Sequence, residues 1–123
     1  MYTADGKTNG PAFSWPDGKR IAVMVTFDYD AEFLRMSRAK SKGTSIGFTD
    51  FSRGQYGPHE GLARCLDMLD TMNIKSTFFV PGAVIETYRD TVEEIHRRGH
   101  ELACHGYQHE SSPELTREEM EEI

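Results

Sequence analysis

The hydrophobic pattern of the chain alternates between short continuous apolar runs and segments with a helical repeat. The run from Ile21 to Phe27, within "RIAVMVTFDYD", is rich in β-branched side chains. Such a run is typical of a strand that is buried on both faces of a parallel sheet. Two shorter apolar runs, in "KSTFFVPG" and "HELAC", have the same character, and Pro81-Gly82 ends the first of them. The pattern therefore predicts three strands.

Two segments between these strands repeat their apolar residues at steps of three and four, as an amphipathic helix does. They are "HEGLARCLDMLDTMNI" and "YRDTVEEIHRRGH", and Gly99 suits the position that follows a helix end. In "LTREEM", Thr116 and Glu119 fit a capping box that opens a third helix. The predicted inward-facing residues are Leu62, Cys65, Leu66, Leu69 and Met72 in the first helix, and Tyr88, Val92 and Ile95 in the second.

The remaining segments show no clear periodicity. Residues 36–57 contain four of the eleven glycines, and a connection of that length in a compact domain is usually functional or disordered. Residues 1–14 are predicted to be an arm, and "WPDGKR" is predicted to be a turn. The resulting order is strand, long loop, helix, strand, helix, strand, helix. This alternation predicts one α/β domain with a parallel sheet built from right-handed βαβ units.

Composition narrows the class of protein. The chain of 123 residues is 37% hydrophobic and 28% charged, with a net charge of -6, which argues against nucleic acid or an anionic membrane as a partner. No apolar run approaches the roughly 20 residues of a spanning helix, and the N-terminus lacks the pattern of a signal peptide. Cys65 and Cys104 are too few for a disulfide framework and are predicted to be buried free thiols. We therefore expect a cytoplasmic protein.

Polar residues that can carry chemistry follow two of the predicted strands. Asp28 and Asp30 end the first strand, and two residues of separation in extended backbone put both carboxylates on one side. His105 and His109 follow the third strand, where Gly106 lets the chain turn sharply. Because sites in parallel α/β folds collect at the carboxyl ends of the strands, we expect these side chains to converge.

Two imidazoles and one carboxylate form a ligand set that leaves open positions on a divalent metal. A second carboxylate is then free to act as a base toward metal-bound water, whose pKa zinc lowers to roughly 7. That is the chemistry of a hydrolase. The residues alone leave open the alternative of a turn or capping role for the aspartates and of two solvated loop histidines. In "FSRGQYG", Arg53 and Tyr56 either contact a substrate or belong to an ordinary glycine-rich surface loop.

Taken together, "TFDYDAE", "SRGQYG", "KSTFFVPG" and "GHELACHGYQHE" resemble motifs of the polysaccharide deacetylase family, the NodB-homology fold. They look most like its cytosolic branch, which includes peptidoglycan deacetylase-like proteins, cyclic-imide hydrolases and allantoinase-like proteins. The resemblance covers roughly residues 15–123. It implies the N-terminal half of a NodB-homology domain, that is, the N-terminal part of an irregular, TIM-like (β/α)7 barrel, preceded by the arm at 1–14.

The resemblance also implies roles for individual residues. Asp28 corresponds to the catalytic base, and Asp30, His105 and His109 correspond to the ligands of one divalent metal. Zinc is the first choice of metal, with cobalt, nickel or manganese as alternatives. Tyr29 separates the two aspartates here, as in the cytosolic branch. The family's general acid has no counterpart in this chain.

The function implied by the resemblance is metal-dependent hydrolysis of non-peptide C–N bonds, as in a polysaccharide or peptidoglycan N-deacetylase. The partner would be an N-acetyl amino sugar or another small molecule with an amide. One alternative is a cyclic-imide or ureide hydrolase, and a second is a non-catalytic half-domain that binds or regulates. Because the resemblance covers only the first part of the fold, we expect the chain to form a homo-oligomer or to depend on a C-terminal half, and to be inactive alone.

Overall fold

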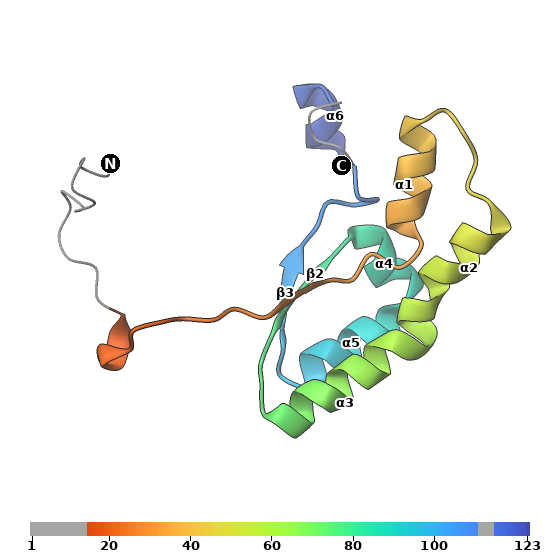
Figure 1. Ribbon diagram of the computed structural model, residues 1–123. Helices are drawn as coiled ribbons and strands as arrows, with labels where there is room; N and C mark the ends of the chain where they lie inside the picture. The colour runs from red at the N-terminus through yellow and green to blue at the C-terminus, as the bar shows by residue number, and fades with distance from the viewer. Residues whose placement is uncertain (1–14, 111–114) are drawn as a thin grey trace, which may run out of the picture.

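A parallel sheet forms the centre of the structure. The computed structural model describes residues 15–110 and 115–123, so the predicted arm at 1–14 lies outside the described residues. The sheet has three strands in the order β1-β2-β3, and both pairs of neighbours are parallel (Figure 1). This confirms the predicted parallel sheet of three strands. The strands are β1 (Thr26–Asp28), β2 (Thr77–Val80) and β3 (Glu101–Cys104).

Six α-helices are present among the described residues, and α3, α4 and α5 lie on one side of the sheet (Figure 1). None of the helices in the described part of the chain is long and apolar enough to cross a membrane. The predicted turn at "WPDGKR" is a single 3₁₀ turn, Pro16–Gly18. The helices are α1 (Phe33–Ser41), α2 (Phe48–Tyr56), α3 (Leu62–Met72), α4 (Gly82–Thr87), α5 (Arg89–Arg97) and α6 (Arg117–Glu122).

The core lies between the sheet and helices α3, α4 and α5. Phe78 of β2 is 1% exposed, and its ring stacks on that of Phe27 with centroids 5.0 Å apart. The predicted inward faces of α3 and α5 are largely confirmed, although Met72 is 59% exposed and its prediction is wrong. Met72 is the last residue of α3, and the chain turns left-handed at Asn73 with φ 52°. The buried face of α3 therefore ends at Leu69. The buried members of these two helices are Leu62, Leu66, Leu69, Val92 and Ile95.

The capping signals are confirmed at both places where the sequence shows them. Gly99 has φ +76° directly after the C-cap of α5. Thr116 Oγ1 accepts a hydrogen bond from the backbone N–H of Glu119, whose carboxylate accepts one from the backbone N–H of Thr116 in return. These local patterns fix helix ends independently of tertiary contacts, which is why the sequence reveals them.

The predicted long connection at 36–57 is wrong, because α1 and α2 occupy most of it. A π-helical turn, Gly57–Gly61, then joins α2 to α3. The packing of α2 depends on Gly54, since a Cβ on that residue would lie 2.4 Å from Cα of Glu32. In the sequence, a glycine at such a contact looks like a helix breaker. It also adds no apolar side chain to the buried face of α2, so the helical pattern is weak. Helix α4 is also additional to the prediction, because Pro81 adopts extended backbone as its N-cap and does not simply stop the strand.

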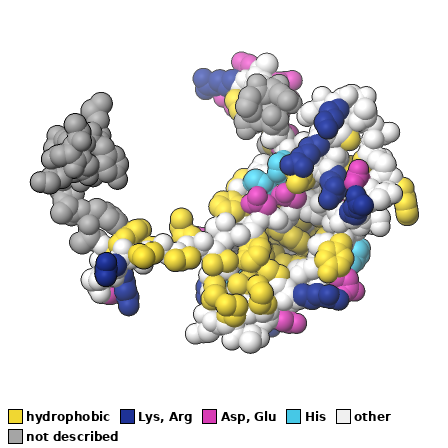
Figure 2. Space-filling model, in the orientation of Figure 1, with side chains coloured by type: hydrophobic (Ala, Val, Ile, Leu, Met, Phe, Trp, Pro, Cys, Tyr) yellow, Lys and Arg dark blue, Asp and Glu magenta, His cyan; other side chains and the backbone are white. Residues whose placement is uncertain are grey.

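The first strand is shorter than predicted. The strand covers only Thr26–Asp28, and Ile21, Val23 and Met24 before it are 78%, 82% and 88% exposed. Burial on both faces is therefore wrong for this segment, because no described element packs against it. Cys104 is also exposed, contrary to the prediction of a buried thiol, whereas Cys65 is half-buried and both are free. Figure 2 shows apolar side chains uncovered along this segment and over the sheet.

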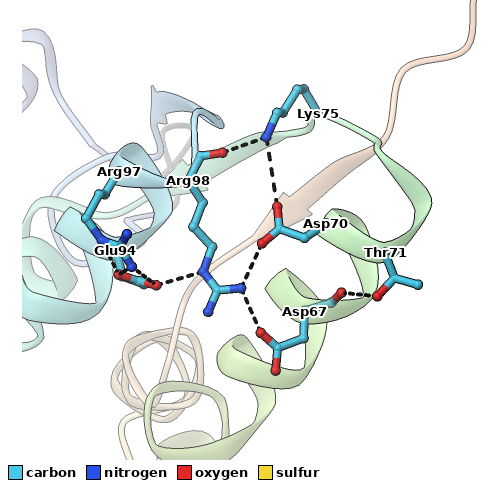
Figure 3. A network of polar contacts seen from close by, with 7 residues as sticks. All are labelled: Asp67, Asp70, Thr71, Lys75, Glu94, Arg97 and Arg98. Carbon is cyan, nitrogen blue, oxygen red and sulfur yellow. Dashed lines mark hydrogen bonds and ion pairs between the residues drawn. The ribbon is translucent and has the colours of Figure 1, made fainter.

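A polar network joins α3 to α5 where β2 and β3 begin (Figure 3). Arg98 donates through Nε to Glu94 at 2.7 Å and through Nη1 to Asp67 at 2.7 Å and Asp70 at 2.9 Å. Lys75 donates to the carbonyl oxygen of Arg98 at 2.7 Å. The hydrogen bonds that Arg98 donates to these carboxylates raise its pKa above the ordinary value, so its charge is permanent. One guanidinium thus cross-links two helices at the amino ends of the strands.

We predict that Arg98→Ala lowers the urea midpoint of unfolding more than Arg97→Ala does. Arg97 is a matched control because it pairs with the same Glu94 but only within α5. The gap between the two variants should shrink in about 1 M sodium chloride, where the Debye length is about 3 Å. Equal midpoints for the two variants at low salt would show that Arg98 does not cross-link the helices in solution.

Candidate metal centre

Asp30 is placed by the way β1 runs into α1. The backbone N–H of Tyr29 donates to the carbonyl of Phe79 at 2.8 Å, which extends the pairing with β2 by one residue. Ala31 then turns the chain with φ 50°, and the carbonyl of Asp30 accepts from the N–H of Phe33 at the start of α1. Tyr29 anchors this turn to α5, because its hydroxyl lies 2.8 Å from Oγ1 of Thr91. Burial of this side chain raises the pKa of Tyr29 to about 12.

The loop after β3, residues 105–110, is held against the start of α4. Gly106 adopts φ 72°, and its carbonyl accepts a hydrogen bond from the N–H of Gly82 at 3.0 Å. The carbonyl of Tyr107 accepts from the N–H of Ala83 at 2.9 Å. The first amides of a helix lack partners within the helix, so the loop satisfies them while they fix its path. Gly82 must be a glycine for this contact, because a Cβ there would lie 2.6 Å from the Tyr107 ring.

Glu110 closes the same loop from its other end. Its Oε2 accepts from the N–H of Tyr107 at 3.0 Å, and its Oε1 accepts from the N–H of Gln108 at 2.7 Å. Burial alone would raise the pKa of Glu110, but the backbone N–H groups around it outweigh burial and lower the pKa. Ser37 of α1 donates to the carbonyl of His109 at 2.7 Å, where the chain has φ 61°. The segment that carries the two histidines is thus fixed by two helices and by its own carboxylate.

Sequence reasoning missed both Glu110 and Ser37. A signal for Glu110 does exist, since an acid that follows a glycine-containing loop can accept from the backbone N–H groups of that loop. Ser37 gives no signal, because its contact with His109 spans 72 residues and depends on where α1 packs.

The structure brings Asp30, His105 and His109 together. Nε2 of His105 lies 3.5 Å from Oδ1 of Asp30, and Nε2 of His109 lies 3.7 Å from Oδ2. The two imidazole rings are perpendicular, with centroids 4.6 Å apart. One potential ligand atom from each residue lies within 4.8 Å of the others. The carboxylate is 12% exposed and the imidazoles 30% and 28%, so the cluster is sheltered but open on one side.

Two atoms of this cluster are buried potential metal ligands without another partner. Oδ1 of Asp30 and Nε2 of His105 are buried, and neither has a hydrogen-bond partner among the described residues. A buried polar atom without a partner costs about 1–3 kcal/mol, and a divalent cation among the three side chains would give each a ligand bond. Two imidazole nitrogens and a carboxylate oxygen are donors that suit zinc and its neighbours in the first transition row.

The charge balance at the cluster points the same way. Burial raises the pKa of the Asp30 carboxyl, while His109 and His105 act to lower it and the charge of Asp28 raises it further. Asp28 is exposed at the end of β1, two residues before Asp30 in the chain. The predicted convergence is found for Asp30, His105 and His109, whereas a place for Asp28 in the site stays a prediction. A cation there would counter the mutual repulsion of the two carboxylates.

The two predicted substrate contacts lie on α2. Arg53 is exposed and pairs with Asp50 of the same helix at 3.7 Å. Tyr56 is 54% exposed, and its ring lies beside Gly61. No contact found among residues 15–110 and 115–123 joins either side chain to the metal-ligand cluster, and a substrate role for them stays a prediction.

The comparisons with known proteins agree on one family. The polysaccharide deacetylase family model matches residues 16–123, and the chain belongs to this family. It is 34% identical over 105 residues to a peptidoglycan deacetylase of Helicobacter pylori, covering 85% of this chain and 35% of that protein. It is 31% identical over 107 residues to the peptidoglycan deacetylase-like protein FGM2 of Gibberella zeae, covering 85% and 31%. The chain thus spans about a third of the length of these curated relatives.

The fold agrees with the family. A crystal structure of a protein from Mycobacterium smegmatis, described as a polysaccharide deacetylase, superposes with a TM-score of 0.80 at 38% identity. The alignment covers 94% of this chain and 40% of that one. The resemblance and the fold class predicted from the sequence, part of a NodB-type (β/α) barrel, are confirmed. The domain boundary at residue 15 stays a prediction.

We predict that Glu110→Ala weakens cobalt(II) binding about 10- to 100-fold, the usual cost of removing a group that orients metal ligands. Cobalt(II) is the probe because its visible absorption also reports the ligand geometry, which should change in the variant. Glu93→Ala is the control: it removes the same charge from an exposed site on α5, where Glu93 pairs with Arg89. Wild-type affinity together with a wild-type spectrum for Glu110→Ala would show that the carboxylate does not position the histidines.

Proposed function

We propose that this chain carries the metal site of a hydrolase of non-peptide C–N bonds, whose reaction is the N-deacetylation of an acetylated amino sugar. The observation that carries the proposal is the convergence of Asp30, His105 and His109, with two buried ligand atoms that have no other partner among the described residues. Membership of the polysaccharide deacetylase family and the names of the peptidoglycan deacetylases to which the chain is similar support the same reaction.

A metal at this site, zinc by our proposal, would polarise the amide carbonyl and make water acidic enough to lose a proton near neutral pH. Asp30, His105 and His109 are the residues that would hold it. Their positions are set before any metal binds, because the loop after β3 is fixed by α4, by Ser37 and by Glu110. Preorganised ligands lose little freedom on binding, which favours tight metal binding and a constant orientation of the open positions.

Asp28 is the group that we propose as the general base. It is exposed at the end of β1, and no hydrogen bond or ion pair ties its carboxylate to another part of the described chain. It lies close enough to Asp30 to affect the pKa of that residue. A free carboxylate at this position can accept the proton of the attacking water, a role that typically contributes about 10²–10⁴-fold in rate.

We predict that Asp28→Asn, in the full-length zinc-loaded protein, retains the metal but loses at least about 10²-fold in kcat on N-acetylglucosamine oligomers. The amide keeps the shape of the carboxylate but cannot take up the proton. Elemental analysis after dialysis and release of acetate are the measurements. Succinimide belongs in the same assay, because faster opening of its ring than release of acetate would identify the reaction as cyclic-imide hydrolysis.

Two further variants make the result interpretable. His105→Ala should lose most of its zinc, because two remaining protein ligands hold the ion poorly, whereas His96→Ala, on the exposed face of α5, should keep it. Loss of zinc from Asp28→Asn would make Asp28 a ligand and remove it as the base. Acetate release at the wild-type rate by Asp28→Asn would contradict the proposed mechanism.

A further inference from the structure

Helix α1 is strongly basic in a chain that is acidic overall. From Phe33 to Lys42 the sequence has four cations and no acid, whereas the net charge of the whole chain is -6. Arg35 forms an ion pair with Asp50 at 3.3 Å. Arg38 and Lys42 are exposed, and no ion pair or hydrogen bond from either side chain is found in the described part of the chain. Like charges at helical spacing repel one another, so this arrangement is unfavourable unless something anionic compensates it.

The unpaired cations line a hollow that also contains a candidate metal ligand. A cavity of about 300 Å³ lies between α1 and the loop after β3, and its lining includes Arg38, Lys42 and His109. Ser37 and Ser41 lie on the same wall, where the Ser37 hydroxyl donates to the carbonyl of His109. Glu110 also lines the cavity, but its two oxygens already accept hydrogen bonds from the loop backbone. The cations of α1 and His109, one of the three candidate ligands, thus border the same space.

Arg38 is close to the metal centre as well as to the hollow. Its charge contributes to lowering the pKa of Asp30, although burial of that carboxyl outweighs it. Figure 2 shows Lys and Arg side chains directly beside the histidine and acidic side chains. A guanidinium carries a planar fork of donors that matches the two oxygens of a carboxylate or phosphate group.

The cations could instead serve only to neutralise the acids of the metal site. In that case Arg38 or Lys42 would form an ion pair with Asp28, Asp30 or Glu110. The ion pairs found among the described residues include none of these combinations, although Arg35–Asp50 on the same helix shows that such a pair forms where a partner is in reach. The free donors are therefore available to a ligand.

We propose that the hollow bounded by Arg38, Lys42 and His109 binds an anionic substituent of the substrate, a carboxylate or phosphate group close to the amide that is cleaved. This inference rests on the proposed hydrolase function and narrows its substrate class from amides in general to anionic ones. The expected selectivity comes from the substituent, whereas the reaction at the amide depends on the metal centre and Asp28.

The test compares N-acetylmuramic acid with N-acetylglucosamine, which share the acetamido sugar and differ in one carboxylate-bearing substituent. In the full-length zinc-loaded protein, wild type should favour the acid in kcat/KM. Arg38→Ala combined with Lys42→Ala should reduce that preference about 10- to 100-fold, mainly through KM, because charge-assisted hydrogen bonds are lost. Arg35→Ala is the matched control on the same helix and should keep the preference, since Arg35 is paired with Asp50.

Binding separates this inference from the proposed function. Isothermal titration of zinc-loaded Asp28→Asn with each sugar measures affinity without turnover. If N-acetylmuramic acid binds more tightly than N-acetylglucosamine, and the Arg38/Lys42 variant loses this difference in affinity, the anion site is supported. This holds even if no acetate is ever released. Equal affinity for both sugars, or an equal loss with both in the Arg38/Lys42 variant, would overturn it. Absence of acetate release from either sugar in wild type would instead count against the proposed function.

Discussion

The site depends on closing a gap across the middle strand. β1 and β3 both flank β2, so their axes are separated by two strand spacings, about 9–10 Å. Nevertheless, Nε2 of His105 lies 3.5 Å from Oδ1 of Asp30. The loop after β3 covers the distance because Gly106 turns with positive φ and its carbonyl is held by the N–H of Gly82. Without that contact with α4, residues at the ends of non-adjacent strands would not meet.

The polar groups at the two ends of the sheet have different surroundings. At the amino ends, Arg98 and its carboxylates have their hydrogen bonds satisfied and join α3 to α5. At the carboxyl ends, buried ligand atoms have no partner in the described residues and a basic helix faces open space. Unsatisfied groups cost free energy of folding, and folds retain such groups mainly at functional sites. Buried side-chain atoms without a partner also occur at the amino ends, on Ser76 and His100, so what distinguishes the carboxyl ends is the clustering of potential ligands on Asp30, His105 and His109.

The sequence predicted the parts of the structure that depend on local patterns. The positions of β2 and β3, the stripe Leu62-Leu66-Leu69 and the capping box at Thr116 all follow from local patterns, although β3 is largely exposed and not buried as its apolar run predicts. The convergence of Asp30, His105 and His109 was predictable because parallel strands bring their carboxyl ends to one edge, so Asp and His after two strands lie close together. Their roles came from the resemblance to a family, because the residues alone left the two aspartates interchangeable.

What the sequence did not predict depends on tertiary contacts. Helix α2 packs through Gly54, whose missing side chain gives no apolar signal, and so the segment looked like a loop. Residues 21–24 have the composition of a buried strand, but no described element covers them. Glu110 acts through backbone N–H groups, which have no sequence signature beyond the presence of an acid.

The central claim is that Asp30, His105 and His109 form a metal centre. Zinc-edge X-ray absorption of the metal-loaded protein tests it most directly, because multiple scattering from imidazole rings is distinctive and because Cys104 adjoins His105 in sequence. The account predicts two histidine nitrogens and further oxygen ligands, all at about 2.0–2.2 Å, with no sulfur. A zinc–sulfur distance of about 2.3 Å, or a shell of oxygen without imidazole, would contradict it.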